Sequence, residues 1–155
     1  MKRCWFATAS VLAIVVAVTS CSSDATGPSN KDCTESTTAV NATTSVGDSV
    51  VFDWTPKCTL ALLVVETTDG HDQWWVAGFN PDTVDIPTTA ANRISPRVTY
   101  GHVPTSATDS FGPESLVAGT TYVVALWRVL PSGSTLQCQQ NHGTACLVGV
   151  TSFTR

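Results

Sequence analysis

Short runs of β-branched and aromatic residues, separated by glycine, proline, asparagine and aspartate, make up most of the chain after residue 33. Apolar positions in these runs often alternate with polar ones, which predicts strands, and they do not recur at the helical spacing of three and four. The predicted strands are Ser49–Trp54, Leu60–Thr67, Gln73–Phe79, Arg97–Tyr100, Thr121–Leu130 and Ala145–Phe153. Strands of this length and spacing predict an all-β fold, an antiparallel β-sandwich.

Two of the runs resemble conserved parts of the fibronectin type III module, an immunoglobulin-like sandwich. Its second strand ends in a core tryptophan before a proline-containing turn, as Trp54 does before Pro56. A leucine, a glycine and a tyrosine lead into its sixth strand, as Leu116, Gly119 and Tyr122 do here. The resemblance implies that Tyr122 forms a tyrosine corner, with its ring in the core and its hydroxyl bonded to backbone just upstream.

The resemblance covers about residues 37–153, and the chain departs from the module in two respects. Most modules of this type lack disulfides, whereas this chain is rich in cysteine. The stretch Thr67–Pro96 is also longer than the module predicts, so the order of the middle strands stays open.

The strand that contains Tyr122 carries apolar residues on both faces. If Tyr122 points inward, Ala125 and Trp127 point outward, because successive side chains alternate between the two faces. Trp74 and Trp75 are adjacent, so a regular strand turns one of them away from the core.

Trp74, Trp75 and Trp127 therefore form a candidate binding face, together with Leu63 or Val65 of the neighbouring strand. Exposed apolar patches often mark interaction surfaces, and indole rings also suit the apolar faces of sugars. In the alternative interpretation, the long middle stretch or the hairpin near the last two cysteines folds over this face and buries it.

The amino terminus has the pattern of an export signal. Lys2 and Arg3 precede the apolar run Trp5–Val18, which is shorter than the roughly 20 apolar residues needed to span a bilayer. With Cys21 at the expected cleavage site, the segment resembles the lipobox of bacterial lipoproteins. That resemblance implies a lipid thioether on Cys21, and Ser22 in place of aspartate favours the outer membrane. A plain signal peptide or a short membrane anchor is the alternative.

The chain thus divides into a signal peptide (residues 1–20), a lipidated flexible tether (21–32) and a β-sandwich domain (33–155). The segment Ser22–Asp32 contains no large apolar side chain. Such a segment cannot bury enough surface to offset its ordering entropy, so we expect it to be flexible.

Loss of the signal makes the protein more acidic. The whole chain has 8 basic and 12 acidic residues, and removal of Lys2 and Arg3 leaves 6 against 12, a net charge of −6. Nucleic-acid binding requires a basic footprint. The composition therefore argues against a nucleic-acid partner.

Four cysteines fall within the predicted domain, and in an exported protein they predict two disulfides. We favour Cys33–Cys58 and Cys138–Cys146, because each pair lies within one end of the chain. No C-x2-C pair is present and the histidines are scattered, so no metal site is expected.

The sequence contains no serine-hydrolase, zinc-protease or phosphate-loop motif. Asp72, Asp82 and Asp85 allow only a weak hydrolase hypothesis, since paired carboxylates can cleave glycosides. We expect a non-enzymatic protein of the bacterial cell envelope, anchored to the membrane by lipid and requiring no cofactor. Its expected role is that of a protein-interaction or structural module, and the alternative is a carbohydrate-binding module that uses exposed tryptophans.

Overall fold

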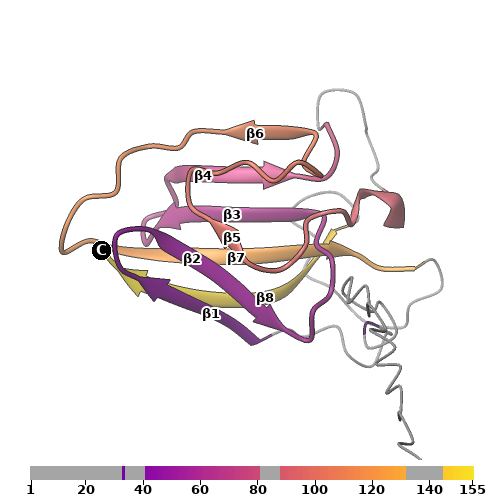
Figure 1. Cartoon of the computed structure of the whole chain (residues 1–155), viewed down its shortest axis with the longest axis horizontal. Helices are drawn as coiled ribbons and strands as arrows, with labels where there is room; N and C mark the ends of the chain where they lie inside the picture. The colour runs from indigo at the N-terminus through magenta and orange to yellow at the C-terminus, as the bar shows by residue number, and fades with distance from the viewer. Residues whose placement is uncertain (1–32, 34–40, 81–87, 132–144) are drawn as a thin grey trace, which may run out of the picture.

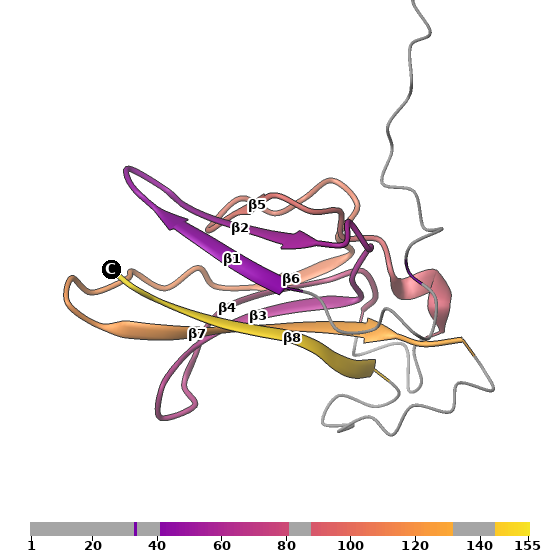
Figure 2. The same ribbon diagram turned by 90° about the horizontal axis from the view of Figure 1, so that it is seen from below.

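The computed structural model describes residues 33, 41–80, 88–131 and 145–155. In this part of the chain two antiparallel sheets face each other (Figures 1 and 2). One sheet has the strand order β1-β2-β5 and the other the order β6-β4-β3-β7-β8. The elements are β1 (Asn41–Val46), β2 (Val50–Thr55), β3 (Leu62–Thr67), β4 (Asp72–Ala77), the 3₁₀ helix η3 (Thr89–Ala91), β5 (Val98–Thr99), β6 (Asp109–Phe111), β7 (Thr121–Val129) and β8 (Ala145–Thr154). The predicted all-β antiparallel sandwich is confirmed.

All six predicted strands are present, with ends that differ by a few residues, and two further strands, β1 and β6, were not predicted. Strand β1 pairs with β2 so that Ala42 lies opposite Trp54 and Thr44 opposite Phe52. Its positions beside the core hold small or polar side chains, which leave no alternating apolar signal. Strand β6 has three residues and pairs only with β4, so it is too short to show a period.

The space between the sheets is filled by a cluster of aromatic and aliphatic side chains. Phe52 and Trp74 are 1% and 0% exposed, and their ring centroids lie 6.3 Å apart. Trp74 also meets Tyr100 edge-on at 5.2 Å, while Tyr122 stacks on Phe153 at 5.4 Å. These contacts bring together residues of both sheets, so the aromatic cluster joins the two layers.

Tyr122 forms the predicted tyrosine corner. Its ring is 1% exposed, and its hydroxyl oxygen accepts a hydrogen bond from the backbone N–H of Val117 at 2.8 Å. The turn between them includes Gly119 with a φ of +79°, a conformation that favours glycine. This corner fixes the entry into β7, the strand that lies between β3 and β8.

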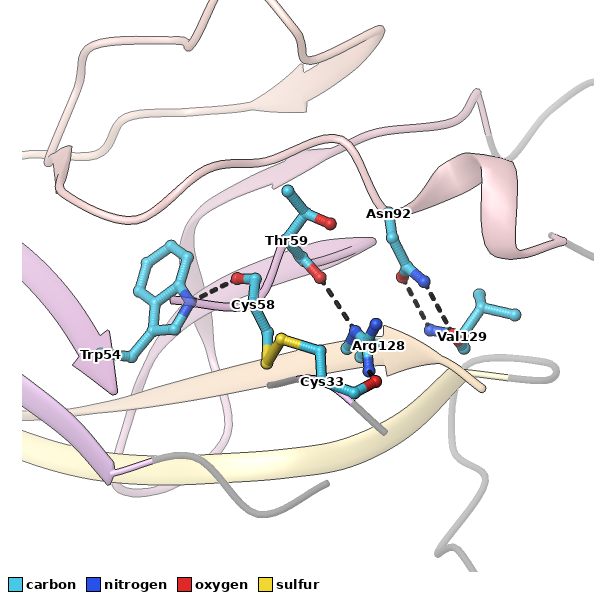
Figure 3. The surroundings of a disulfide bond; sticks show 7 residues. All are labelled: Cys33, Trp54, Cys58, Thr59, Asn92, Arg128 and Val129. Carbon is cyan, nitrogen blue, oxygen red and sulfur yellow. Dashed lines mark hydrogen bonds between the residues drawn. A yellow bond between two sulfur atoms is a disulfide. The ribbon is translucent and has the colours of Figure 1, made fainter. Parts of the chain in front are cut away.

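The disulfide Cys33–Cys58 fastens the start of the domain to the link between β2 and β3, as predicted (Figure 3). The backbone around it is held by buried donors. Trp54 Nε1 donates to the carbonyl oxygen of Cys58 at 2.7 Å. The guanidinium of Arg128 donates through Nε to the carbonyl of Thr59 at 3.1 Å and through Nη1 to that of Cys33 at 3.2 Å.

Arg128 is 7% exposed, and burial lowers the pKa of its guanidinium from the ordinary value. Both of its hydrogen-bond acceptors in this network are neutral carbonyls. Nearby, Asn92 bonds through its amide to both the N–H and the carbonyl of Val129, at 2.9 and 2.7 Å (Figure 3). The end of β7 is therefore held by side chains on its β3 edge, where the pairing stops at Trp127, while its other edge continues to pair with β8.

Several predictions lie outside the described residues. They include the signal peptide, Cys21 and the tether, and also Asp82 and Asp85 of the hydrolase hypothesis. Cys146 is disulfide-bonded, but Cys138 is outside the described part of the chain. The pairing Cys138–Cys146 therefore stays a prediction.

Candidate interaction surface

The outer face of the five-stranded sheet, which points away from β1, β2 and β5, carries a second apolar cluster. Along β7, Tyr122, Val124 and Leu126 belong to the inter-sheet core, whereas Ala125 and Trp127 belong to the outer cluster. The predicted orientation of this strand is therefore confirmed.

The structure separates the two adjacent tryptophans of β4. Trp74 is 0% exposed in the inter-sheet core, while Trp75 lies on the outer face and is half-buried. Trp74 is thus unable to contribute to a binding face. Trp127 shares the outer face with Trp75 but is only 5% exposed, as the burial alternative predicts for this position.

The neighbouring strand β3 differs from the prediction in its register. Leu63 and Val65 were expected beside the outward tryptophans, but both lie in the inter-sheet core. Leu62 and Val64 take the outward positions instead. Since all four residues are apolar, the sequence does not reveal which parity of β3 faces the core.

One continuous row crosses all five strands of the outer face. Its members, in strand order, are Phe111, Trp75, Val64, Ala125 and Val150. Phe111 is 44% and Val150 53% exposed, whereas Val64 and Ala125 are 6% and 8% exposed. The row is therefore open at its ends and closed in its middle.

The β6 end of this row presents two aromatic rings together. Trp75 and Phe111 lie directly opposite each other on neighbouring strands. Their ring planes are 15° apart, with centroids separated by 6.3 Å. Sequence reasoning missed Phe111, because β6 is short and its position opposite Trp75 depends on pairing between segments far apart in the chain.

Acidic side chains flank this aromatic pair. Strand alternation places Glu66 on the same face as Val64, and Asp109 on the same face as Phe111. Asp109 is a diagonal neighbour of Trp75, at a typical separation of about 7–8 Å between backbones, whereas Glu66 lies opposite Asp72, beyond an irregularity in the pairing of β3 with β4. Arg128 is the sole lysine or arginine in the five strands, and its side chain points to the disulfide end (Figure 3).

An open pocket of about 280 Å³ lies where β4 ends, next to η3. It is lined by Gly78, Phe79, Asn80, Thr88, Ala90, Ala91, Arg93 and Thr108. Most of its exposed lining is apolar, and Arg93 Nε is engaged with the carbonyl of Ala90 at 2.9 Å. None of the predicted site residues lines this pocket.

Within the described residues, no group of three or more histidine, cysteine or acidic side chains is arranged to hold a metal ion. His71 faces Asp69 at 3.6 Å on the surface, and Asp72 is exposed. Among these described residues, no helix has the length and hydrophobicity that a membrane span requires.

No family model matches the sequence, and neither a curated protein nor a solved structure matches it. The fold and its packing therefore define the class of this protein. It is an all-β sandwich of two antiparallel sheets, with a tyrosine corner and one end closed by a disulfide.

Proposed function

We propose that this protein is a lipid-anchored interaction module of the bacterial cell envelope, without enzymatic activity. Its contact surface is the β6 end of the outer sheet face, formed by Trp75 and Phe111. The observation that carries the proposal is that an exposed Phe111 and a half-buried Trp75 stack side by side on the outer face of the sheet. Aromatic side chains are enriched in protein interfaces and lose little conformational entropy when a partner covers them.

The way the domain begins supports a tethered role. Cys33 directly follows the predicted tether, and it is bonded covalently to Cys58 and through its carbonyl to Arg128. A tether that ends at Cys33 would be attached to the buried disulfide at one end of the sandwich and not to the exposed strand β1. The aromatic pair would then be presented by a domain whose attachment point is firmly held.

The carbohydrate-binding alternative has weaker support. It required two outward tryptophans, and of the three candidates only Trp75 is appreciably exposed, because Trp74 and Trp127 are 0% and 5% exposed. A sugar would have to use Trp75 with Phe111, a pair that the sequence hypothesis did not include.

Photo-crosslinking of the full-length chain in living bacteria tests the interaction surface. We expect the crosslinker p-benzoylphenylalanine at position 111 to trap a discrete protein. The matched control is position 46, because Val46 is 47% exposed, close to the 44% of Phe111, but belongs to the three-stranded sheet. An absence of adducts at position 111, or the same adducts at both positions, would contradict the proposed surface.

The lipid anchor is tested separately. We expect the Cys21→Ser variant to leave the membrane fraction, because the lipid thioether forms on the sulfur of Cys21. Retention of that variant in the membrane at the level of the unaltered protein would contradict lipid anchoring, whatever the crosslinking result.

A further inference from the structure

Acidic residues lie around the aromatic pair Trp75–Phe111. Asp109 is the diagonal neighbour of Trp75 on β6, while Glu66 of β3 lies opposite Asp72, beyond an irregularity in the pairing of β3 with β4. Glu66 and Asp109 are partly exposed and Asp72 is exposed, and Oδ1 of Asp109 accepts a hydrogen bond from the backbone N–H of Ser110 at 2.8 Å.

No cation of the same five strands balances these charges. The strands β3, β4, β6, β7 and β8 contain Arg128 as their only basic residue, and that guanidinium is buried against the carbonyls of Thr59 and Cys33. His71, beside β4, faces Asp69. Outside these strands, Arg93 lines the pocket together with Thr108, the residue before Asp109, and its Nε donates to the carbonyl of Ala90. The outer face is therefore apolar along its central row and acidic beside Trp75, with an arginine near the end of β4.

Two aromatic rings flanked by carboxylates are complementary to a positively charged side chain. A lysine ammonium or an arginine guanidinium is attracted to the face of an indole or phenyl ring, and the carboxylates add hydrogen bonds and charge attraction. A neutral sugar would gain the ring contact but no attraction from the negative field. An anionic membrane surface would be repelled by it.

We infer that the Trp75–Phe111 pair, with Glu66 and Asp109, binds a lysine- or arginine-bearing segment of a partner protein. The cationic side chain lies over the aromatic pair between the two carboxylates. Apolar side chains next to it in the partner pack along the row toward Val64. This inference rests on the proposed function, because it names the chemistry of the partner for the same surface.

Fluorescence anisotropy of the full-length chain in a non-ionic detergent tests the inference. The probe is a labelled peptide of alternating lysine and leucine, and the comparison peptide has glutamate in place of lysine. We expect the lysine peptide alone to bind, with an affinity that falls as salt is added, since ions screen partly exposed charges.

Two variants of the surface and two matched controls identify the residues involved. Phe111→Ser and the double variant Glu66→Gln/Asp109→Asn are each expected to weaken binding of the lysine peptide by about tenfold. Val46→Ser and Asp48→Asn change an exposed apolar and an exposed acidic residue on and beside β1. These controls are expected to leave the affinity unchanged.

Equal affinity for the lysine and glutamate peptides, or full affinity in Glu66→Gln/Asp109→Asn, overturns the inference. If crosslinking at position 111 persists in cells while the lysine peptide fails to bind, the interaction surface stands and its cationic partner is wrong. If a soluble oligosaccharide blocks crosslinking at position 111 and the lysine peptide does not, the ligand is a glycan and the inference is overturned.

Discussion

The two faces of the five-stranded sheet are both apolar, but they differ in how far their side chains are exposed to solvent. On the inner face, Trp74 and Tyr122 are 0% and 1% exposed, and aromatic contacts link Trp74 to Phe52 of the opposite sheet. On the outer face, the central row ends in Phe111 and Val150, which are 44% and 53% exposed. One sheet thus supports a sealed core on one side and a partly open apolar surface on the other.

The difference shows what alternation along a strand can and cannot reveal. In β7, alternation separates the side chains of the two faces correctly. It does not reveal which face is sealed, because sealing depends on the elements that pack against each face. That information lies in long-range pairing, such as that of β6 with β4.

The largest expected effect comes from two adjacent residues on opposite faces. Trp74→Ala removes a fully buried indole, and we expect it to lower the free energy of unfolding by about 3–5 kcal/mol. Trp75→Ala removes a half-buried indole, so its loss should stay below about 2 kcal/mol. Urea denaturation of both variants measures the difference.

If Trp74→Ala is too unstable to purify, Trp74→Phe replaces it, with an expected loss that still exceeds that of Trp75→Ala. Equal losses for Trp74→Ala and Trp75→Ala would contradict the distinction between a sealed and an open face.

The next effect concerns the disulfide, which belongs to the sealed side. Cys33→Ser combined with Cys58→Ser opens a covalent loop between cysteines 25 positions apart, and we expect a loss of about 2–4 kcal/mol in the free energy of unfolding. The cause is the greater freedom of the unfolded chain. Denaturation of the double variant beside the unaltered protein measures the loss. An unchanged stability would mean that the Arg128 network alone holds this end.

Much of the sealed side could be predicted from the sequence, because its signals are local. Trp54 stands at the end of an alternating run, and Tyr122 follows a leucine and a glycine at a recognisable spacing. The pairing Cys33–Cys58 followed from the position of both residues at one end of the chain, and the structure confirms it.

The open side could be predicted only in part. The sequence indicated that one of two adjacent tryptophans would face outward, but β3 is apolar on both parities and offered no sign of its register. Phe111 has no local signal at all, since its role depends on pairing with Trp75 across the sheet. The acidic residues Glu66 and Asp109 lie far apart in the sequence, and they form one acidic surface only because strand pairing brings β3, β4 and β6 together.

The tyrosine corner provides a smaller test of the sealed side. Tyr122→Phe keeps the ring but removes the hydroxyl oxygen that accepts the N–H of Val117. We expect a loss of about 1 kcal/mol in the free energy of unfolding, the net value of one hydrogen bond. Urea denaturation measures it. A loss above about 3 kcal/mol would mean that the hydroxyl also supports the packing of β7.

The stability of the sealed side should also depend on alkaline pH through Tyr100. Burial, followed by the nearby Tyr122 and Glu114, raises the pKa of Tyr100 to about 12, and its hydroxyl donates to the carbonyl of Glu114 at 2.6 Å. Because the folded-state pKa lies above the ordinary value of 10.0, the contribution is complete below pH 10. It is lost as the pH rises toward about 12.

This alkaline loss should stay below about 1 kcal/mol, since Tyr100 is only half-buried and solvent screens the charge. Urea denaturation between neutral pH and pH 12 measures it, with Tyr100→Phe as the comparison. The variant should show a shallower alkaline decline than the unaltered protein. Parallel declines would mean that other groups cause the alkaline loss.

The smallest expected effect on stability is that of Phe111→Ser, at the open end of the outer row. Phe111 is 44% exposed, so its aromatic contact with Trp75 should contribute only about 0.5 kcal/mol, the low end for such pairs. Val46→Ser, at a similarly exposed position of the other sheet, should cost about the same. Because we expect the fold to depend little on Phe111, a tenfold loss of peptide binding in Phe111→Ser would result from the lost surface contact and not from unfolding. A stability loss above about 2 kcal/mol would instead make Phe111 part of the packed fold, and the outer face would then be closed at this end as well.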